Sequence, residues 1–137
     1  MNQLKVKVIH IKNVNNLNYL TFSLNQQIIH MLSLELEPTI KVGTIVHLTA
    51  KSTHVALAKD LKGLLSVENR LDAFVVSIED GEILSSICLD IEGFLFESII
   101  TTESRKRMNL KVDDSVTALI NATDISIKEI SGELGLI

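Results

Sequence analysis

The sequence predicts an all-β fold made of two small, similar barrels in tandem, and three observations lead to that prediction. The chain of 137 residues is 46% hydrophobic but only 4% aromatic, and Ile, Val and Leu dominate its apolar residues, which favours strands over long helices. Short apolar segments alternate with turns that contain Asn, Asp and Gly. An internal repeat covers nearly the whole chain, so that one supersecondary unit is present twice.

The repeat emerges when the chain is aligned with itself. A shift of 67 positions pairs the segment starting at Asn2 with that starting at Asn69, and a shift of 70 pairs the segments starting at Lys41 and Lys111. The identical pairs are Asn2/Asn69, Leu4/Leu71, Val8/Val75, Ile11/Ile78, Leu17/Leu84, Lys41/Lys111, Val42/Val112, Val46/Val116 and Thr53/Thr123. We therefore divide the chain into repeat 1, residues 1–64, and repeat 2, residues 65–137.

Repeat 2 predicts five strands and one short helix. The expected strands cover residues 71–78, 83–89, 94–100, 116–120 and 125–127, with turns at 79–81 and 91–93. A change of apolar phase between Val75 and Val76 indicates a bulge in the first strand. Thr101 or Thr102 is expected to cap the helix, and Asn109 stands where a left-handed residue would end it. A helix after the third of five strands is typical of a Greek-key barrel of the OB type.

Repeat 1 has the same plan without the helix. Its segment MLSLELEPTIKVG is shorter than its counterpart and contains Pro38, so we expect a turn there. Because a barrel of about 65 residues buries a modest core, we expect the copies to pack on each other or on another chain. A homo-oligomer is therefore expected, with the apolar tail SGELGLI contributing.

Several functional classes have little support in the sequence. The net charge of −4 and the lack of stacking aromatics oppose nucleic-acid binding. No apolar run approaches the length of a membrane span and no secretory signal is evident, so we expect a soluble, cytoplasmic protein without a membrane partner. Cys88 is the single cysteine, the four histidines lack metal-ligand spacing, and no catalytic triad, GxSxG motif or P-loop occurs. We expect no enzyme activity and no metal ligated directly by side chains.

Small polar residues gather at corresponding strand ends of the two repeats. They form the runs 51–54 and 121–124, together with Ser66 and with Thr101, Thr102 and Ser104 at the predicted helix start. Clustered hydroxyl and backbone N–H donors suit a small tetrahedral oxyanion. The same residue types are also common in ordinary turns and helix caps, and composition and spacing leave both interpretations open.

Two blocks resemble a known family. TTESRKRMNLKVDDSVTALINATDI resembles the second half of the molybdate-binding Mop unit, or TOBE domain, and LLSVENRLDAFVVSI resembles its beginning. The tandem arrangement resembles the di-Mop proteins called molbindins. The resemblance implies OB-like barrels that assemble into dimers or trimers and bind molybdate or tungstate at subunit and repeat interfaces.

The resemblance also implies the residues that hold the anion. These are Lys51, Ser52, Ser66, Thr101, Ser104, Asn121 and Ala122, the last through its backbone N–H. The chain departs from the family pattern at Glu68, where an arginine is usual, and at Asn121, where a lysine is usual. We therefore expect an oxyanion-binding protein for molybdenum storage, homeostasis or transport regulation. The alternative is a degenerate sensory or oligomerisation module that acts through protein partners.

Overall fold

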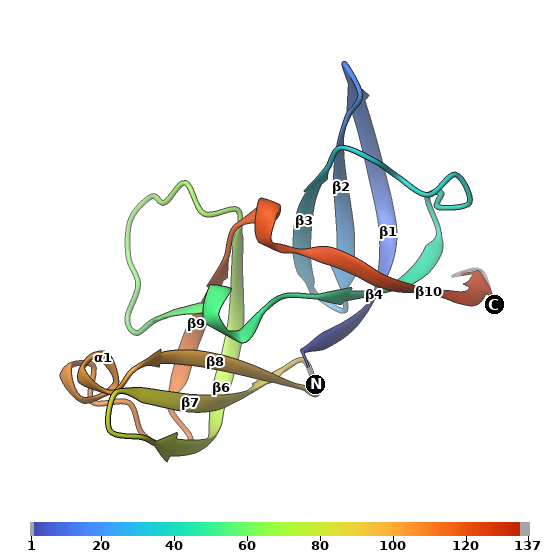
Figure 1. The fold of residues 1–137 in the computed structure, drawn as a ribbon. Coiled ribbons are helices and arrows are strands. Elements are labelled where there is room, and N and C mark those ends of the chain that lie inside the picture. Colours follow the sequence, from blue (N-terminus) through green and yellow to red (C-terminus); the bar gives the residue numbers. More distant parts are fainter. Residues whose placement is uncertain (1, 135–137) are drawn as a thin grey trace.

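The computed structural model of the chain describes residues 2–134, which form two five-stranded antiparallel sheets (Figure 1). The elements of repeat 1 are β1 (Gln3–Val14), β2 (Leu17–Leu24), β3 (Gln27–Ser33), β4 (Thr44–Thr49), the 3-10 turn η1 (Ser52–His54) and β5 (Ala56–Ala58). Those of repeat 2 are β6 (Asn69–Asp80), β7 (Leu84–Ile91), β8 (Phe94–Thr101), α1 (Thr102–Arg107), β9 (Ser115–Ile120), the 3-10 turn η2 (Ala122–Asp124) and β10 (Ser126–Leu134). The prediction of an all-β fold with one short helix in repeat 2 is confirmed.

The two repeats exchange their last strands. The first sheet has the order β10-β4-β1-β2-β3 and the second has the order β5-β9-β6-β7-β8. Each sheet therefore takes four strands from one repeat and one from the other, whereas the sequence led us to expect each repeat to supply its own five. The boundaries 1–64 and 65–137 remain a prediction for the sequence repeats, but they do not separate two complete sheets.

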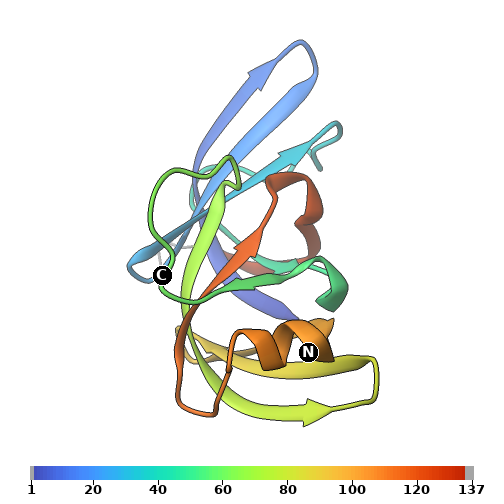
Figure 2. The same ribbon diagram turned by 90° about the vertical axis from the view of Figure 1, so that its left-hand side faces the viewer.

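Short connections direct this exchange. Only Ala50 and Lys51 separate β4 from η1, and only Val55 separates η1 from β5, so the chain passes directly from one sheet to the other. Beyond β5, the Lys59 ammonium donates to the carbonyl of Asn109 at 3.0 Å and pairs with Asp114 at 3.0 Å. These contacts stabilise the position of β5 in the second sheet. Residues 59–68 then form a wide loop that leads to β6 (Figures 1 and 2).

Local features follow the sequence closely. The ladder between β6 and β7 shifts register between Val75 and Ser77, as the apolar phase change predicts, and the β1–β2 ladder shifts at the corresponding place, between Val8 and His10. The Thr101 side chain accepts a hydrogen bond from the Ser104 N–H and caps α1, and Asn109 has the left-handed φ of 51°. The first repeat has no helix between β3 and β4, as expected from Pro38.

Strand ends differ from the prediction. The turn expected at residues 79–81 is wrong in its first part, since Glu79 and Asp80 pair with Ser86 and Ser85 in the β6–β7 ladder. The strand continues there because an exposed end of a hairpin needs no apolar side chains to keep its backbone hydrogen bonds. Strand β10 runs to Leu134 rather than stopping at Ile127. Residues 135–137 of the tail expected to aid oligomerisation lie outside the described part of the chain.

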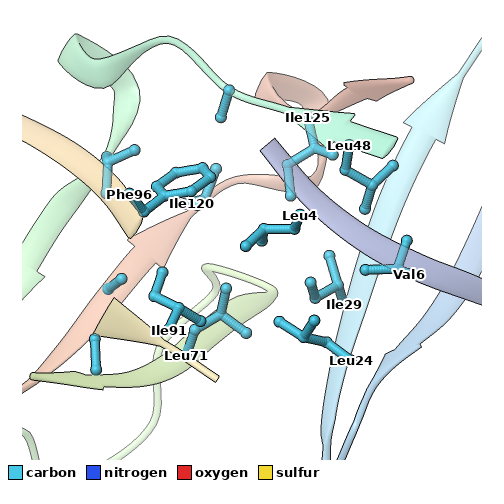
Figure 3. Close-up of a cluster of buried hydrophobic side chains, with 14 of the residues drawn as sticks. Leu4, Val6, Leu24, Ile29, Leu48, Leu71, Ile91, Phe96, Ile120 and Ile125 are labelled. Carbon is cyan, nitrogen blue, oxygen red and sulfur yellow. The ribbon is translucent and has the colours of Figure 1, made fainter. Parts of the chain in front are cut away.

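One hydrophobic core passes through both sheets (Figure 3). Leu4 of β1 lies near the centre of the view, with Ile29 and Val6 of the first sheet on one side and Leu71 and Ile91 of the second on the other. All are almost fully buried. The repeats therefore pack as one unit, which agrees with the expectation that such small barrels need a neighbour.

Paired asparagines fix the repeats to each other with the same geometry in both directions. The Asn69 side chain accepts from the backbone N–H of His30 at 2.7 Å and donates to its carbonyl at 2.9 Å. Asn2 makes the equivalent pair with the backbone of Glu97, at 2.7 and 2.9 Å. Because Asn2 and Asn69 occupy equivalent repeat positions, as do His30 and Glu97, the two contacts are related by an approximate two-fold symmetry.

We expect Asn69→Ala to lower the free energy of unfolding by about 2–4 kcal/mol, because the half-buried backbone N–H and carbonyl of His30 both lose their partner. Asn69 is fully buried. Urea unfolding followed by circular dichroism measures the change. Asn121→Ala removes an exposed asparagine whose side chain makes no cap hydrogen bond, and should change stability by less than about 0.5 kcal/mol. Equal effects of both substitutions would contradict the role assigned to Asn69.

Candidate functional site

The first polar cluster lies where η1 of repeat 1 packs against β8 of repeat 2. We define it as Asn2, Ser52, Ser86 and Glu97. The Ser52 hydroxyl donates to one carboxylate oxygen of Glu97 at 2.7 Å, and the Ser86 hydroxyl donates to the other at 2.5 Å. The Asn2 amide donates to the Ser52 Oγ at 3.1 Å. Strand exchange thus brings a predicted anion ligand, Ser52, onto a carboxylate of the other repeat.

The carboxylate of this cluster is held in its ionised form. Hydrogen bonds from Ser86 and then Ser52 lower the pKa of Glu97 below its ordinary value of 4.5, against a smaller opposing effect of burial. Charge-assisted hydrogen bonds of this kind are among the stronger polar contacts in proteins. The first cluster therefore carries a negative charge whose hydroxyl partners are both donors.

This shift gives a pH dependence of stability. Because the folded-state pKa of Glu97 lies below its ordinary value, the ionised carboxylate stabilises the fold above that value, and the contribution disappears as the pH falls through the folded-state pKa. We expect Glu97→Gln to lower the free energy of unfolding at pH 7 and the difference from wild type to close toward pH 2. Urea unfolding across this range measures it. Glu92→Gln, in the turn between β7 and β8, is the charge-matched control, and a gap independent of pH would contradict the assignment.

The second polar cluster lies where η2 of repeat 2 packs against β3 of repeat 1. We define it as Tyr19, His30, Glu68 and Ala122. The backbone N–H of Ala122 donates to a carboxylate oxygen of Glu68 at 3.1 Å. The Tyr19 ring stacks on the His30 imidazole, with centroids 5.2 Å apart. Burial, and then the negative charge of Glu68, raise the pKa of Tyr19 above its ordinary value of 10.0.

The two clusters are built from equivalent repeat positions. The equivalent pairs are Ser52/Ala122, Glu97/His30 and Ser86/Tyr19, with Lys51 and Asn121 immediately before the two 3-10 turns. Lys51 and Asn121 are both exposed. In each cluster a glutamate carboxylate accepts a hydrogen bond from the first residue of the 3-10 turn, Ser52 or Ala122. The two glutamates are not equivalent in the repeat, because Glu97 lies within β8 and Glu68 immediately precedes β6.

A third polar group surrounds the start of α1. The Thr101 hydroxyl donates to the Ser104 Oγ at 2.9 Å, and the Arg107 guanidinium donates to the same oxygen at 3.1 Å. They border a cavity of about 450 Å³ that Glu82 and Glu103 also line. Arg107 is a cation here that was not predicted as a site residue, because a position four residues after Glu103 on a short helix indicates an ion pair within the helix, which the structure contains at 3.9 Å.

The predicted site residues thus fall into separate places. Lys51 and Ser52 are adjacent at η1, Asn121 and Ala122 are adjacent at η2, and Thr101 and Ser104 meet at α1. Ser66 is exposed in the loop before β6, and Arg70, the cation nearest to Glu68 in sequence, donates to the carbonyl of Gly63 at 3.4 Å. Ser86 and Glu97 were not predicted as site residues, since nothing local in the sequence of β7 or β8 marks them.

The two 3-10 turns meet near the symmetry axis. His54 Nδ1 lies 3.6 Å from Asp124 Oδ1, and these are equivalent positions of the two repeats. A cavity of about 360 Å³ lies beside them and is lined by Lys51 and Thr123 as well. Lys51 therefore borders a space into which both repeats contribute donors.

Within residues 2–134, no group of three or more His, Cys, Asp or Glu side chains is arranged to hold a metal ion. In the same part of the chain, no helix is both long and apolar enough to cross a membrane.

The fold and these polar groups define a class: two OB-like barrels in tandem, with hydroxyl and N–H donors at their strand ends. Residues 65–127 match the family model of the TOBE domain. The structure is similar to that of the cytoplasmic molybdate-binding protein ModG with molybdate bound, at 25% sequence identity and a TM-score of 0.85, over 92% of this chain and 94% of that one. Residues 65–127 therefore form a TOBE domain, and the likeness to ModG over both repeats is consistent with a tandem Mop/TOBE protein.

A further solved structure is similar over part of the chain. It is a molybdate-binding protein from Sporomusa ovata, 31% identical, and the match covers 49% of this chain and all of that one with a TM-score of 0.47. Among curated proteins, no sequence matches this chain significantly.

Proposed function

We propose that this protein binds molybdate or tungstate in the cytoplasm and serves intracellular molybdenum storage, homeostasis or transport regulation without catalysing a reaction. The observation that carries the proposal is its likeness to molybdate-bound ModG over nearly the full length of both chains. The likeness extends across both repeats.

Ligand capture would use directed donors in place of hydration water. The candidates are Lys51, Ser52, Ser66, Thr101, Ser104, Asn121 and the backbone N–H of Ala122. Lys51 is the one cation among them, and it borders the cavity between the two 3-10 turns. A dianion placed there would gain a charge-assisted hydrogen bond as well as Coulomb attraction. Cavity size would then separate molybdate from the smaller sulfate ion.

Oligomerisation is part of the proposal. Exposed apolar side chains on β6 and β8, among them Phe74, Val76 and Leu95, are available to a second copy of the chain. We propose a homo-oligomer, dimer or trimer, in which such contacts bring further donors to the anion.

A second candidate function is a degenerate sensory or oligomerisation module that acts through protein partners. The specific observation that favours it is Glu68, which already uses the Ala122 N–H, together with the neutral Asn121 where the family has a lysine. Under this alternative the protein would form stable complexes with a partner and contain no molybdenum.

Titration calorimetry with sodium molybdate, sodium tungstate and sodium sulfate tests the proposal. We expect measurable heats for the first two, and for sulfate binding at least about tenfold weaker, because a smaller anion cannot contact all of the fixed donors. Heats equal to those of buffer for molybdate and tungstate would contradict the proposal. Protein purified from cells supplied with molybdate should also contain molybdenum by elemental analysis.

A further inference from the structure

Glu97 has a polar environment that would equally suit a bound oxyanion. Its two carboxylate oxygens accept hydrogen bonds from the hydroxyls of Ser52 and Ser86, at 2.7 and 2.5 Å. A hydroxyl has one proton to donate. While these two hydroxyls serve Glu97, neither can donate to an anion from solution, and the negative carboxylate would also repel it.

The backbone of Glu97 is held by hydrogen bonds, whereas its side chain is partly exposed to solvent. Its N–H and carbonyl are both bonded to the Asn2 side chain, which holds this part of β8 against repeat 1. The side chain is only half-buried. A change of rotamer can therefore withdraw the carboxylate from Ser52 and Ser86 without disturbing the strand.

In the second cluster a glutamate also accepts a hydrogen bond from the 3-10 turn, but this glutamate comes from a different position in the repeat. There the position equivalent to Glu97 is occupied by His30, and the carboxylate comes instead from Glu68, which accepts from the Ala122 N–H at 3.1 Å. Ser52 and Ala122 are equivalent positions. At both 3-10 turns, then, the donor at the first residue of the turn is engaged by a glutamate of the same chain.

We propose that Glu97 is an internal competitor for the oxyanion site at η1: its carboxylate occupies the Ser52 and Ser86 hydroxyls in the free protein and must move aside before a ligand can use them. This inference rests on the proposed oxyanion-binding function and adds a residue that limits its affinity. The site therefore binds more weakly than its donors alone would allow, and ligand is released when the carboxylate returns.

The test compares four proteins by titration calorimetry with sodium molybdate: wild type, Glu97→Gln, Glu97→Ala and Glu92→Gln. Glu97→Gln keeps the side-chain volume and removes the charge, whereas Glu97→Ala removes the carboxylate and adds no new donor. Glu92→Gln changes the net charge equally in the turn between β7 and β8. Thermal unfolding of each protein without ligand serves as the control that each variant is folded.

We expect both Glu97 variants to bind molybdate at least about tenfold more tightly than wild type, equivalent to about 1.4 kcal/mol, with Glu92→Gln unchanged. Wild-type binding with equal or weaker binding by Glu97→Ala would overturn the inference and leave the proposed function standing. Tighter binding by Glu97→Gln alone would also overturn it, because the new amide donor would then explain the gain. Binding by the Glu97 variants but not by wild type would support the inference and contradict the proposed function of the native chain. Absence of binding in all four would overturn both.

Discussion

Fragments 1–64 and 65–137 are expected to fold in each other's presence and not as separate monomers. Fragment 1–64 lacks β10, which pairs with β4, and fragment 65–137 lacks β5, which pairs with β9. Each fragment alone would also expose its half of the shared core to water. We expect the separate fragments to show no cooperative thermal transition as monomers, and an equimolar mixture to recover the circular dichroism and transition of the intact chain.

The experiment has a matched control in the linking loop. Cleavage of the folded chain within residues 59–68 should leave both halves associated, because that loop supplies neither β5 nor β10. A fragment alone can use its own last strand to pair with a second copy of itself, so its behaviour must be followed as a function of concentration. A single fragment that unfolds cooperatively as a monomer would contradict the dependence on exchanged strands.

Lys51→Ala is expected to weaken molybdate binding by about ten- to a hundredfold. Lys51 is exposed at the start of η1 and borders the cavity that both repeats line. A hydrogen bond to a charged group contributes about 1.5–3 kcal/mol, which corresponds to this range. Titration calorimetry gives the dissociation constant, and elemental analysis of protein from molybdate-supplied cells gives the loading.

Two further variants distinguish the effect of the Lys51 charge on molybdate affinity from the effect of the net charge of the protein. Lys51→Arg retains the positive charge and should keep most of the affinity, while Lys12→Ala removes an exposed lysine of β1 and should leave binding unchanged. Unaltered binding by Lys51→Ala would remove Lys51 from the site. An equal loss with Lys12→Ala would show that overall charge, rather than a specific donor, governs affinity.

Features fixed by neighbouring residues could be predicted from the sequence. The bulge after Val75, the cap at Thr101 and the left-handed Asn109 depend on side-chain alternation and backbone preference within a few residues. The exchange of β5 and β10 could not be predicted in this way. A strand presents the same alternation of apolar and polar side chains whichever sheet it joins, so the pattern of 125–127 fits either partner.

In the candidate site, too, the residues at strand ends could be predicted from the sequence, whereas the contacts between the repeats could not. Ser52 and Ala122 lie at corresponding strand ends and were expected as donors from the family resemblance, and the structure places them at equivalent turns. Glu97 lies in a strand of the opposite repeat and meets Ser52 only through the strand exchange, and Ser86 of the neighbouring strand donates to the same carboxylate. A contact between residues 45 positions apart depends on how the sheets are assembled, which local pattern does not encode.

The strand exchange has a consequence for how such a protein assembles at low abundance. If a single repeat formed the same pair of sheets, it would have to meet a second molecule, and the folded fraction would fall on dilution. Joining the repeats in one polypeptide through residues 59–68 makes the encounter intramolecular, and short connections of this kind give effective concentrations of about millimolar. The completed pair of sheets then forms at any cellular copy number, and the concentration of chains decides only the assembly of further subunits.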